Sequence, residues 1–424
     1  MKKLLLIALV ASTLVFTGCF KDDDQPLIVE TSTTIINEGT GETGEDCPVI
    51  AVTGEIANGT VWTNDNIYQL NQKVVIPAGA TLTINPGTII KGSSGTGSLA
   101  SALIVARGGT LNANGTAEEP IVFTSTQDNI SCGQTAGTNL DQDDRGLWGG
   151  LIVLGNAPCS FSGDIVEAQI EGIPADDSFG LYGGTDAGDS SGSMRYISIR
   201  HGGALIGEGN EINGLTLGGV GSGTIIDNIE VVANVDDGIE FFGGTCDASN
   251  LLVWAQGDDA IDIDQAYSGT VDNVVVVLGD ISDHAFEIDG PEGTGSGLFT
   301  LRNATIIGNT VTANGEYADY RSNAQGLTEN VFAFGFKDSS DVELDNDGVA
   351  TNYNNGDLTF GPWEIVLPAG VTDVTSIFVN KAENVTVTGF GSTATAVAEG
   401  ANTVGATTSE LSWTFSNVEG GLGF

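Results

Sequence analysis

The sequence predicts an all-β protein, folded as a single-stranded right-handed parallel β-helix. Three consecutive segments begin at Asn228, Asn250 and Asn273, and each contains an aliphatic strand, an acidic corner and a second strand of alternating apolar and acidic residues. The asparagines lie 22 and 23 residues apart, and such a fixed period is typical of a solenoid in which one repeat makes one turn. The 61 glycines and the lack of helical periodicity after the N-terminus favour many short strands with tight turns.

Residues 1–18 have the pattern of a targeting segment. Two lysines precede an apolar run from Leu4 to Phe16, which is too short to span a bilayer comfortably and argues against a transmembrane anchor. The segment resembles a bacterial lipoprotein signal peptide, which implies that Cys19 becomes the lipidated N-terminus. Lys21 and the three aspartates after it resemble the export tag of Bacteroidota surface lipoproteins. We therefore expect an outer-membrane lipoprotein that faces the cell exterior, with a periplasm-facing protein as the alternative.

The mature chain divides into a tether and one elongated domain. Residues 19–46 have few large apolar groups and predict a flexible acidic tether. Residues 47–424 are expected to form the β-helix, with an N-terminal cap and with a C-terminal cap near residues 400–424. Long loops rich in Asp and Gly are expected at 126–146 and 174–193.

The charge of the chain limits its partners. Without the signal peptide, 11 Lys and Arg stand against 56 Asp and Glu, so nothing could neutralise phosphates and nucleic acid is excluded as a partner. Polyanionic glycans are disfavoured for the same reason. Cations and neutral glycans stay open as ligands, and an outer-membrane transporter or self-association stays open as a protein contact. No cofactor is required by the sequence, and Ca²⁺ is the one that its acids could bind.

Two expectations concern single side chains in the irregular regions. Asp186 and Asp189 could hold a calcium ion in the second long loop, although they lack the ligand spacing of an EF-hand; a solvated loop is the alternative. Cys132 and Cys159 flank the same irregular region, and we expect them to form a disulfide in an exported protein. Cys246 ends a corner of the repeat and is expected to be a small buried thiol.

The first strand of each repeat predicts a core face, a turn and an outer face. Its second and fourth residues, such as Leu251 and Val253, should point into the core because side chains alternate along a strand. The leading asparagines should stack as a structural ladder, from Asn228 to Asn330. The outward residues include Leu252 and Trp254, so this outer face must be covered by the chain's own loops or C-terminal segment, or by a partner.

The second strand of each repeat predicts a stripe of carboxylates. If the apolar residues point inward, the outward residues are acidic: Glu240, Asp262, Asp264, Glu287 and Asp289. Neighbouring coils lie about 4.8 Å apart, and like charges at that spacing cost about 1–3 kcal/mol per pair. The stripe therefore requires cations, protons or hydroxyl donors, and it is the predicted binding surface.

The corners before these strands admit a catalytic interpretation. Asn234-Val235-Asp236, Gly257-Asp258-Asp259 and His284 resemble the motifs of polygalacturonase-type glycoside hydrolases. The resemblance implies an inverting mechanism, in which one of Asp258 and Asp259 is the general acid and the other activates water with Asp236. The sequence departs from that family because His284 lacks flanking glycines and no Arg-Ile-Lys follows. Tandem repetition alone would also generate such corners, so a structural role stays open.

A wider resemblance covers most of the mature chain. The segments GLWGGLIVLGNAP, RYISIRHGG, DDGIEFFGG and GDDAIDIDQA resemble a family of lipid-anchored or secreted parallel β-helix proteins from Bacteroidota and marine proteobacteria. The resemblance implies a pectin-lyase-like solenoid and no assigned activity. Three functions remain open: a surface protein that binds cations or neutral glycans, a glycoside hydrolase that uses the four corner residues, and a structural or adhesion scaffold.

Overall fold

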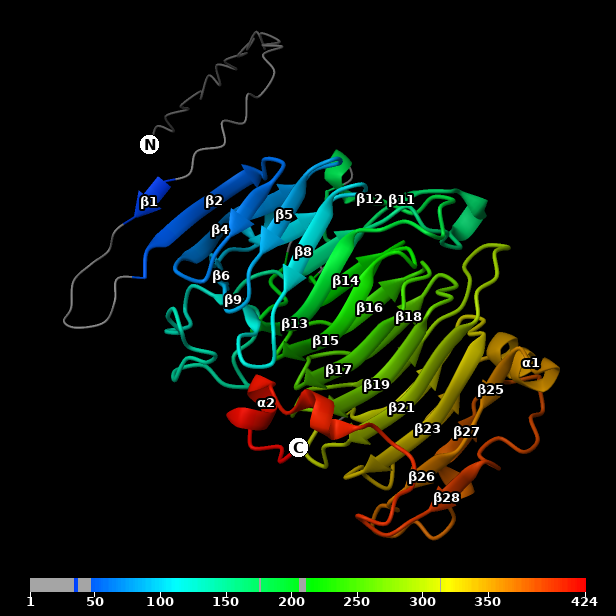
Figure 1. The fold of residues 1–424 in the computed structure, drawn as a ribbon. Helices are drawn as coiled ribbons and strands as arrows, with labels where there is room; N and C mark the ends of the chain where they lie inside the picture. The colour runs from blue at the N-terminus through cyan, green and yellow to red at the C-terminus, as the bar shows by residue number, and fades with distance from the viewer. Residues whose placement is uncertain (1–33, 37–46, 175–176, 206–210, 313) are drawn as a thin grey trace, which may run out of the picture. The chain divides into compact units, whose positions relative to one another are not determined.

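The computed structural model describes residues 34–36, 47–174, 177–205, 211–312 and 314–424. The predicted signal peptide, Cys19 and most of the expected tether lie outside these residues. Within that tether, β1 (Thr34–Ile36) pairs with β2 (Val49–Glu55) in antiparallel orientation. From β2 onward the chain winds through three parallel sheets, which confirms the predicted parallel β-helix (Figure 1).

The first and second sheets share six long strands, each bent so that its two halves belong to different sheets. The first sheet contains β3 (Thr60–Trp62), β5 (Thr81–Ile84), β8 (Thr110–Asn114), the first halves of β13 (Gly192–Arg200), β15 (Ile225–Val232), β17 (Ala248–Trp254), β19 (Thr270–Val277), β21 (Phe299–Ile307) and β23 (Gly326–Phe334), and β25 (Leu358–Phe360). The second sheet contains β2, the first half of β4 (Ile67–Ile76), β6 (Ile89–Gly92), β9 (Ile121–Ser125), the second halves of β13 to β23, β26 (Trp363–Ile365) and β28 (Ala394–Ala396).

The third sheet carries the acidic strands. It contains the second half of β4, β7 (Ala102–Val105), β10 (Leu151–Leu154), β14 (Leu215–Gly218), β16 (Ile239–Phe242), β18 (Ile261–Asp264), β20 (His284–Ile288), β22 (Glu316–Tyr320), β24 (Val342–Leu344) and β27 (Phe378–Asn380). Outside the sheets lie a hairpin of β11 (Ala168–Gln169) and β12 (Leu181–Tyr182), α1 (Asp347–Asn355), α2 (Phe415–Val418) and five short 3₁₀ turns.

One continuous apolar core fills the space between the three sheets. The residues predicted to point inward are buried in it, including Leu251 and Val253 on β17 and Ile261 and Ile263 on β18. The equivalent positions of neighbouring coils stack in register, so each coil extends the same core. The alternation of apolar and polar residues therefore sets which side chains reach the outer faces.

The repeated asparagines form the bend between the first and second sheets. Asn228, Asn250, Asn273, Asn303 and Asn330 all have φ between 56° and 63°, a left-handed conformation that asparagine tolerates better than most residues. The predicted ladder is confirmed at two steps, where Asn273 donates to Asn250 (2.6 Å) and Asn330 donates to Asn303 (3.1 Å). At the two other steps Asn250 and Asn303 donate instead to aspartates that precede the asparagine of the coil before.

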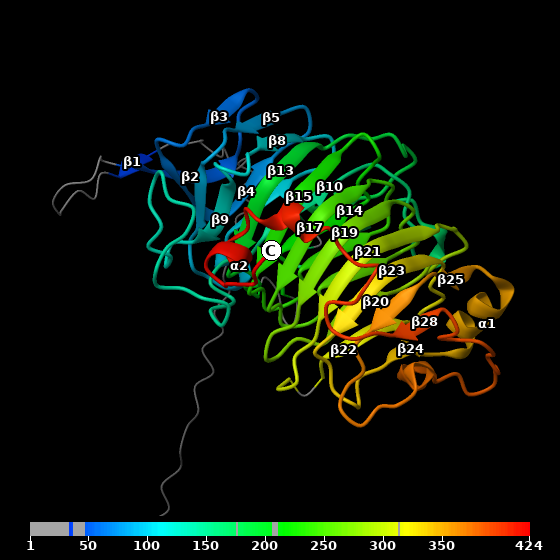
Figure 2. The ribbon, with the colours of Figure 1, turned by 60° about the horizontal axis from the view of Figure 1, so that its bottom comes forward.

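The C-terminal segment covers the apolar outer face of the second sheet. Leu411 is buried against Leu252 and Val275, and Phe415 lies near Trp254 with ring centroids 6.5 Å apart. The segment runs back across β19, β17 and β15 (Figures 1 and 2). The chain thus covers this face itself, as one of the two alternatives predicted, and Leu252 is not free to bind a partner.

The sequence predicted that residues 400–424 cap the last coil. The structure instead places this segment along the side of the β-helix. Glu230 on β15 accepts hydrogen bonds from the backbone N–H groups of Phe415 (3.1 Å) and Ser416 (2.7 Å). Ser198 also donates to Glu230 (2.5 Å), and the Arg200 guanidinium lies 4.3 Å from the centroid of the Phe415 ring. These buried contacts hold the segment several coils away from β28. The prediction of a cap fails because the segment instead buries the apolar outer face of the second sheet and Glu230.

The predicted Cys132–Cys159 disulfide is wrong. Cys132 is bonded to Cys47, with the Cα atoms 5.8 Å apart, and both lie beside the apolar residues of β4, β6 and β9 on the outside of the second sheet. Cys159 instead lies beside the third sheet, where its Sγ is 3.3 Å from the carbonyl oxygen of Phe242. The two ends of one irregular region thus project from different sheets. Cys246 is a buried thiol, as expected, and burial raises its pKa to about 12.

Residues 384–388 form no strand, and the second sheet ends with β26 and β28. None of the helices in the described residues has the length and apolar character needed to span a membrane.

Candidate functional site

The outward side chains of the third sheet form a column of carboxylates. Register pairs Glu240 with Asp262, Asp262 with Glu287, Glu287 with Asp319, and Asp319 with Glu343. Their apolar neighbours on the same strands point into the core. The sequence identified three of these acids, which are Glu240, Asp262 and Glu287. It missed Asp319, although the alternation of Tyr317, Ala318, Asp319 and Tyr320 carries the same signal.

The corners before these strands form a second column. Asp237 stacks with Asp259, and Asp259 stacks with His284. Asp237 accepts a hydrogen bond from the backbone N–H of Asp259 (2.9 Å), and Asp259 accepts one from the backbone N–H of His284 (2.8 Å). The second acid of each corner therefore links its coil to the next. Asn234 also has a local role, because its amide donates to the carbonyl oxygens of Ile212 and Asp237.

The two columns line an open groove of about 380 Å³. Two acids come from loops outside the third sheet: Glu171, after β11, and Glu211, before β14. The sequence missed both, because a single acid in a loop carries no pattern. The residues that line the groove are Glu171, Glu211, Asp236, Asp237, Glu240, Phe242, Asp258, Asp259, Asp262, Asp264, Glu287 and Arg321.

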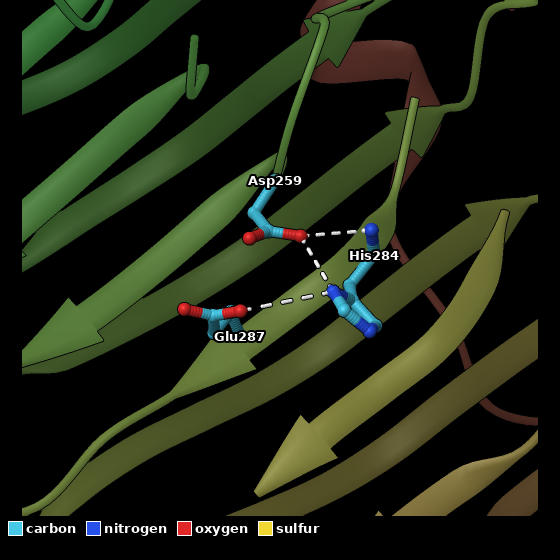
Figure 3. Close-up of side chains that lie close together, drawn as sticks. All are labelled: Asp259, His284 and Glu287. Carbon is cyan, nitrogen blue, oxygen red and sulfur yellow. Dashed lines mark hydrogen bonds and ion pairs between the residues drawn. The ribbon is translucent and has the colours of Figure 1, made fainter. Parts of the chain in front are cut away.

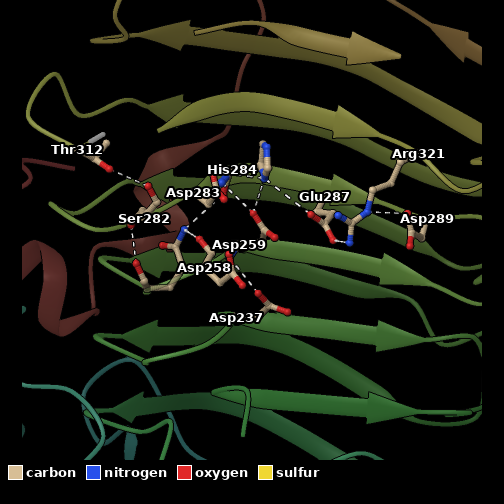
Figure 4. A network of polar contacts seen from close by, with 11 residues as sticks. Asp237, Asp258, Asp259, Ser282, Asp283, His284, Glu287, Asp289, Thr312 and Arg321 are labelled. Carbon is tan, nitrogen blue, oxygen red and sulfur yellow. Dashed lines mark hydrogen bonds and ion pairs between the residues drawn. The ribbon is translucent and has the colours of Figure 1, made fainter. Parts of the chain in front are cut away.

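Toward the C-terminus the carboxylates have cations of the same chain beside them. Asp259, Glu287 and Asp289, together with His284 and Arg321, are called here the compensated cluster. His284 Nδ1 lies 2.8 Å from Asp259 Oδ1 and 3.8 Å from Glu287 Oε2 (Figure 3). Arg321 reaches from the next coil to Glu287 and, at 3.0 Å, to Asp289 (Figure 4).

These contacts fix the charge of His284. Burial opposes its charged form, but the hydrogen bond and the negative charge of Asp259 together raise the pKa of His284 to about 9. The imidazole is therefore a cation at neutral pH. Lys381 has the same role two coils further, where it pairs with Glu343 and lies 3.7 Å from Asp341.

Toward the N-terminus the groove holds carboxylates without such cations. Asp236, Asp237, Glu240, Asp258 and Asp262 are called here the uncompensated cluster. Among the described residues, no lysine, arginine or histidine forms an ion pair with any of these five acids. Oxygens of Asp237, Glu240 and Asp262 all lie within 4.8 Å of one another, and so do oxygens of Asp236, Asp237 and Asp258.

The uncompensated cluster is buried where its acids are closest. Asp237, Glu240 and Asp262 are 7%, 5% and 7% exposed. Asn213 donates a hydrogen bond to Glu240, whereas the buried Oδ1 of Asp262 has no hydrogen-bond partner in the described part of the chain. Burial first, and then the neighbouring carboxylates, raise the pKa values of all three acids well above their usual range.

The acids at the rim of this cluster titrate nearer to neutrality. Burial, followed by the charges of Glu171 and Asp258, raises the pKa of Asp236 to about 7. Burial, followed by the charges of Asp259 and Asp283, raises the pKa of Asp258 to about 6. The rim thus carries groups that exchange protons under physiological conditions.

The comparison with known protein families agrees with the fold. The family described as a pectate-lyase-like β-helix domain matches residues 54–416, which is most of the chain. The chain belongs to the pectate-lyase-like β-helix family. Parallel coils whose strands stack in register are the architecture that this family description names.

Membership in the pectate-lyase-like β-helix family does not assign a reaction. A solved structure, the pectin methylesterase from Aspergillus niger, matches with 13% identity and a TM-score of 0.31, over 84% of this chain and 88% of that one. A likeness at this level says nothing about the activity of the present chain. A comparison with curated proteins found no match.

Three of the predicted catalytic residues, Asp236, Asp258 and Asp259, line the groove, but not in equivalent surroundings. Asp236 and Asp258 lie in the uncompensated cluster, whereas Asp259 and His284 are bonded to each other. The oxygens of Asp236 and Asp258 lie within 4.8 Å, and inverting glycosidases leave about 6.5–9.5 Å between their two carboxyl groups for a water. That pair is therefore better spaced to share a cation or a proton.

The other predicted metal residues lie apart from the groove. Asp189 accepts hydrogen bonds from the backbone and side-chain amides of Asn156, and Asp186 accepts one from the backbone N–H of Gly188. Both acids thus fix the shape of their loop, and calcium binding there stays a prediction.

Proposed function

We propose that this protein is a binding protein whose acidic groove holds a divalent cation, with Ca²⁺ as the favoured ion. The observation that carries the proposal is the unpartnered, buried Oδ1 of Asp262 beside Asp237 and Glu240. Three buried carboxylates at such distances repel one another strongly, since solvent screens them poorly. Only protons or a bound cation can neutralise them where the chain supplies no positive charge.

The geometry and the chemistry of the donors favour calcium among common divalent ions. Ca²⁺ accepts six to eight oxygen ligands at about 2.3–2.6 Å, so opposite ligands lie about 4.6–5.2 Å apart. Carboxylate oxygens within 4.8 Å of one another are compatible with that spacing. The openness of the groove leaves room for water or for ligand hydroxyl groups to complete the shell, and in this way a neutral glycan could bind through the cation.

Isothermal titration of the EDTA-treated full chain with CaCl₂ tests the proposal. Wild-type protein should bind Ca²⁺ at physiological ionic strength, and Asp262→Asn should bind it at least tenfold more weakly. Asp319→Asn is the matched control. Asp319 occupies the same column two coils further and also has a buried Oδ1 without a hydrogen-bond partner, but it belongs to no group of three close carboxylates in the described residues. Wild-type protein that shows no heat and no change in melting temperature with Ca²⁺ would contradict the proposal.

The expected site of action is the outside of the outer membrane, with the protein held by lipid on Cys19. The lipoprotein-like residues 1–18 and the acidic sequence after Lys21 support this placement. Cells that express the chain should incorporate labelled palmitate into wild-type protein and not into Cys19→Ser. Protease added to intact cells should degrade the wild-type protein, and protection from the protease would favour the periplasm-facing alternative.

A glycoside hydrolase is the second candidate. The titrating acids Asp236 and Asp258 in an open groove favour it, because a general acid needs a pKa near the working pH. The chain would then release reducing ends from a neutral polysaccharide, and Asp258→Asn would abolish the release. A polysaccharide screen in which wild-type protein stays inert would count against this candidate and leave cation binding intact.

A further inference from the structure

Asp237 belongs to both carboxylate groups of the uncompensated cluster. It lies with Asp236 and Asp258 in one group and with Glu240 and Asp262 in the other. The first group forms the rim, since Asp236 is half-buried and Asp258 is exposed, and the second group is buried at the floor. Asp237 is thus the common member of an outer and an inner set of ligands.

The carboxylate of Asp237 is held in place before any ligand arrives. Its Oδ1 accepts the backbone N–H of Asp259 on the next coil, at 2.9 Å, and the residue is 7% exposed. An ionised carboxylate has about four lone-pair sites, so one hydrogen bond leaves most of them free. A fixed carboxylate with free lone pairs can bridge two ions.

The charge of the ionised cluster also exceeds that of one divalent ion. The five acids of the two groups carry five negative charges when ionised, and a single divalent cation would leave three of them unbalanced. Two divalent cations supply four positive charges. The unpartnered Oδ1 of Asp262, on a side chain more than nine-tenths buried, indicates that the inner set is built for a ligand.

We propose that the groove holds two divalent cations bridged by Asp237. The inner cation is bound by Asp237, Glu240 and Asp262, and the outer cation by Asp236, Asp237 and Asp258. This inference rests on the proposed function. Known two-metal sites place their ions about 3.5–4 Å apart, which a shared carboxylate permits.

The two positions differ in their access to solvent. The inner cation is enclosed by buried acids and should exchange slowly. The outer cation lies at the rim and can accept ligand oxygens, so it is the position that would bind a vicinal diol of a sugar or a carboxylate from solution. An outer cation would thereby make an acidic groove attractive to ligands that the bare acids repel.

Equilibrium dialysis with ⁴⁵Ca²⁺ at physiological ionic strength tests the inference on the full chain. Wild-type protein should bind two Ca²⁺ with high affinity, Asp258→Asn should bind one, and Asp237→Asn should bind none. Asparagine at 237 keeps an oxygen that can accept the N–H of Asp259, so the coil contact survives the substitution. Asp319→Asn is the control and should retain two ions.

The outcomes separate this inference from the proposed function. One Ca²⁺ on the wild type, with no loss in Asp258→Asn, would contradict the bridged pair and leave a single inner site. No Ca²⁺ on the wild type would overturn both proposals. Circular dichroism and the melting temperature of each apo variant show whether a lost ion reflects a lost fold, and a misfolded Asp237→Asn would be replaced by Asp236→Asn, for which one ion is expected.

Discussion

The compensated and uncompensated clusters are built from the same repeat, yet only one of them has internal positive charge. At the corner, Asp237 and Asp259 occupy the column in which the next coil has His284. One coil further, Arg321 reaches back to Glu287 and Asp289. The carboxylates near these cations are explained by ion pairs within the chain. Those near Asp262 are not.

The difference between the two clusters distinguishes what tandem repetition explains from what it leaves unexplained. Tandem repetition explains why acids recur at equivalent positions, because each coil inherits the pattern of its neighbour. It does not explain why the three buried carboxylates of Asp237, Glu240 and Asp262 lie within 4.8 Å of one another without an ion pair to the chain. A solenoid that needed only a stable acidic face could have used a basic residue there, as it does at Arg321. Our proposal of a ligand from outside the chain rests on the close approach of these acids, none of which pairs with a lysine, arginine or histidine of the described residues.

The largest expected effect is the loss of the calcium response in Asp262→Asn. A ligand at 100 times its Kd stabilises the folded state by about 2.7 kcal/mol. Wild-type protein should gain stability of that order in urea unfolding when Ca²⁺ replaces EDTA, and Asp262→Asn should gain little. An equal gain in Asp262→Asn would place the bound ion outside the uncompensated cluster.

Removal of an internal cation should convert the compensated cluster into an uncompensated one. Arg321→Ala leaves Glu287 without its arginine partner, and breaking a buried pair costs about 3–5 kcal/mol. Because the Arg321 side chain is 39% exposed, solvent screening reduces the expected loss to about 1–3 kcal/mol. Urea unfolding measures the loss, and added Ca²⁺ should restore part of it.

The control for Arg321 is an arginine that pairs at the surface. Arg302→Ala removes a 3.0 Å contact with Asp272, whose side chain is 32% exposed, whereas that of Glu287 is 8% exposed. A surface pair contributes about 0.2–1 kcal/mol. If Arg302→Ala were as damaging as Arg321→Ala, the special role given to the compensated cluster would be wrong.

The stability of the metal-free protein should fall as pH rises. Asp236 and Asp258 have folded-state pKa values of about 7 and 6, above the value of about 4 in an unfolded chain. The folded state therefore holds protons that the unfolded state has released, so stability is lost as pH rises from about 4 to 7. In EDTA the free energy of unfolding should drop across this window by about 1–3 kcal/mol, because solvent screening of these partly exposed acids reduces the larger drop that their pKa values alone would give.

Calcium should remove this pH dependence, because the cation replaces the protons. The melting temperature measured in EDTA and in CaCl₂ between pH 4 and pH 8 compares the two conditions. A melting temperature that rises with pH in EDTA would show that the cluster is not under repulsion.

The smallest expected effect is that of Lys381→Ala. Lys381 pairs with Glu343 at an exposure close to that of Arg321, but it belongs to the last coils, and its flexible ammonium lacks the planar fork of a guanidinium. Its loss should cost less than about 1 kcal/mol, measured by urea unfolding. A loss greater than that of Arg321→Ala would mean that the end of the column, rather than its middle, depends most on internal cations.

The fold was predictable because each coil repeats one pattern. The alternation around Ile261 and Ile263 assigns faces, and Asn250 and Asn273 fix the bend, so local sequence alone gives strands, turns and an acidic stripe. The site was predictable only in part.

The repeat pattern places Asp258 and Asp262 on the acidic corner and strand. Their lack of a cation from the same chain depends on which carboxylates the side chains of His284 and Arg321 reach in the folded structure.

Contacts between distant segments were not predictable. The Cys47–Cys132 disulfide and the packing of Leu411 on Leu252 join residues 85 and more apart in the chain, and no repeat encodes them. Glu171 and Glu211 approach the groove from separate loops for the same reason. Loops have no register with the coils, so their positions follow only from the folded structure.

The most direct measurement is a crystal structure of the full chain grown with Mn²⁺ or Ca²⁺, with anomalous scattering to locate the ions. The account predicts anomalous density among Asp237, Glu240 and Asp262, and none among Asp259, His284 and Glu287, where the chain provides its own cations. Density beside Glu287, or a groove without any bound ion at millimolar Ca²⁺, would contradict it.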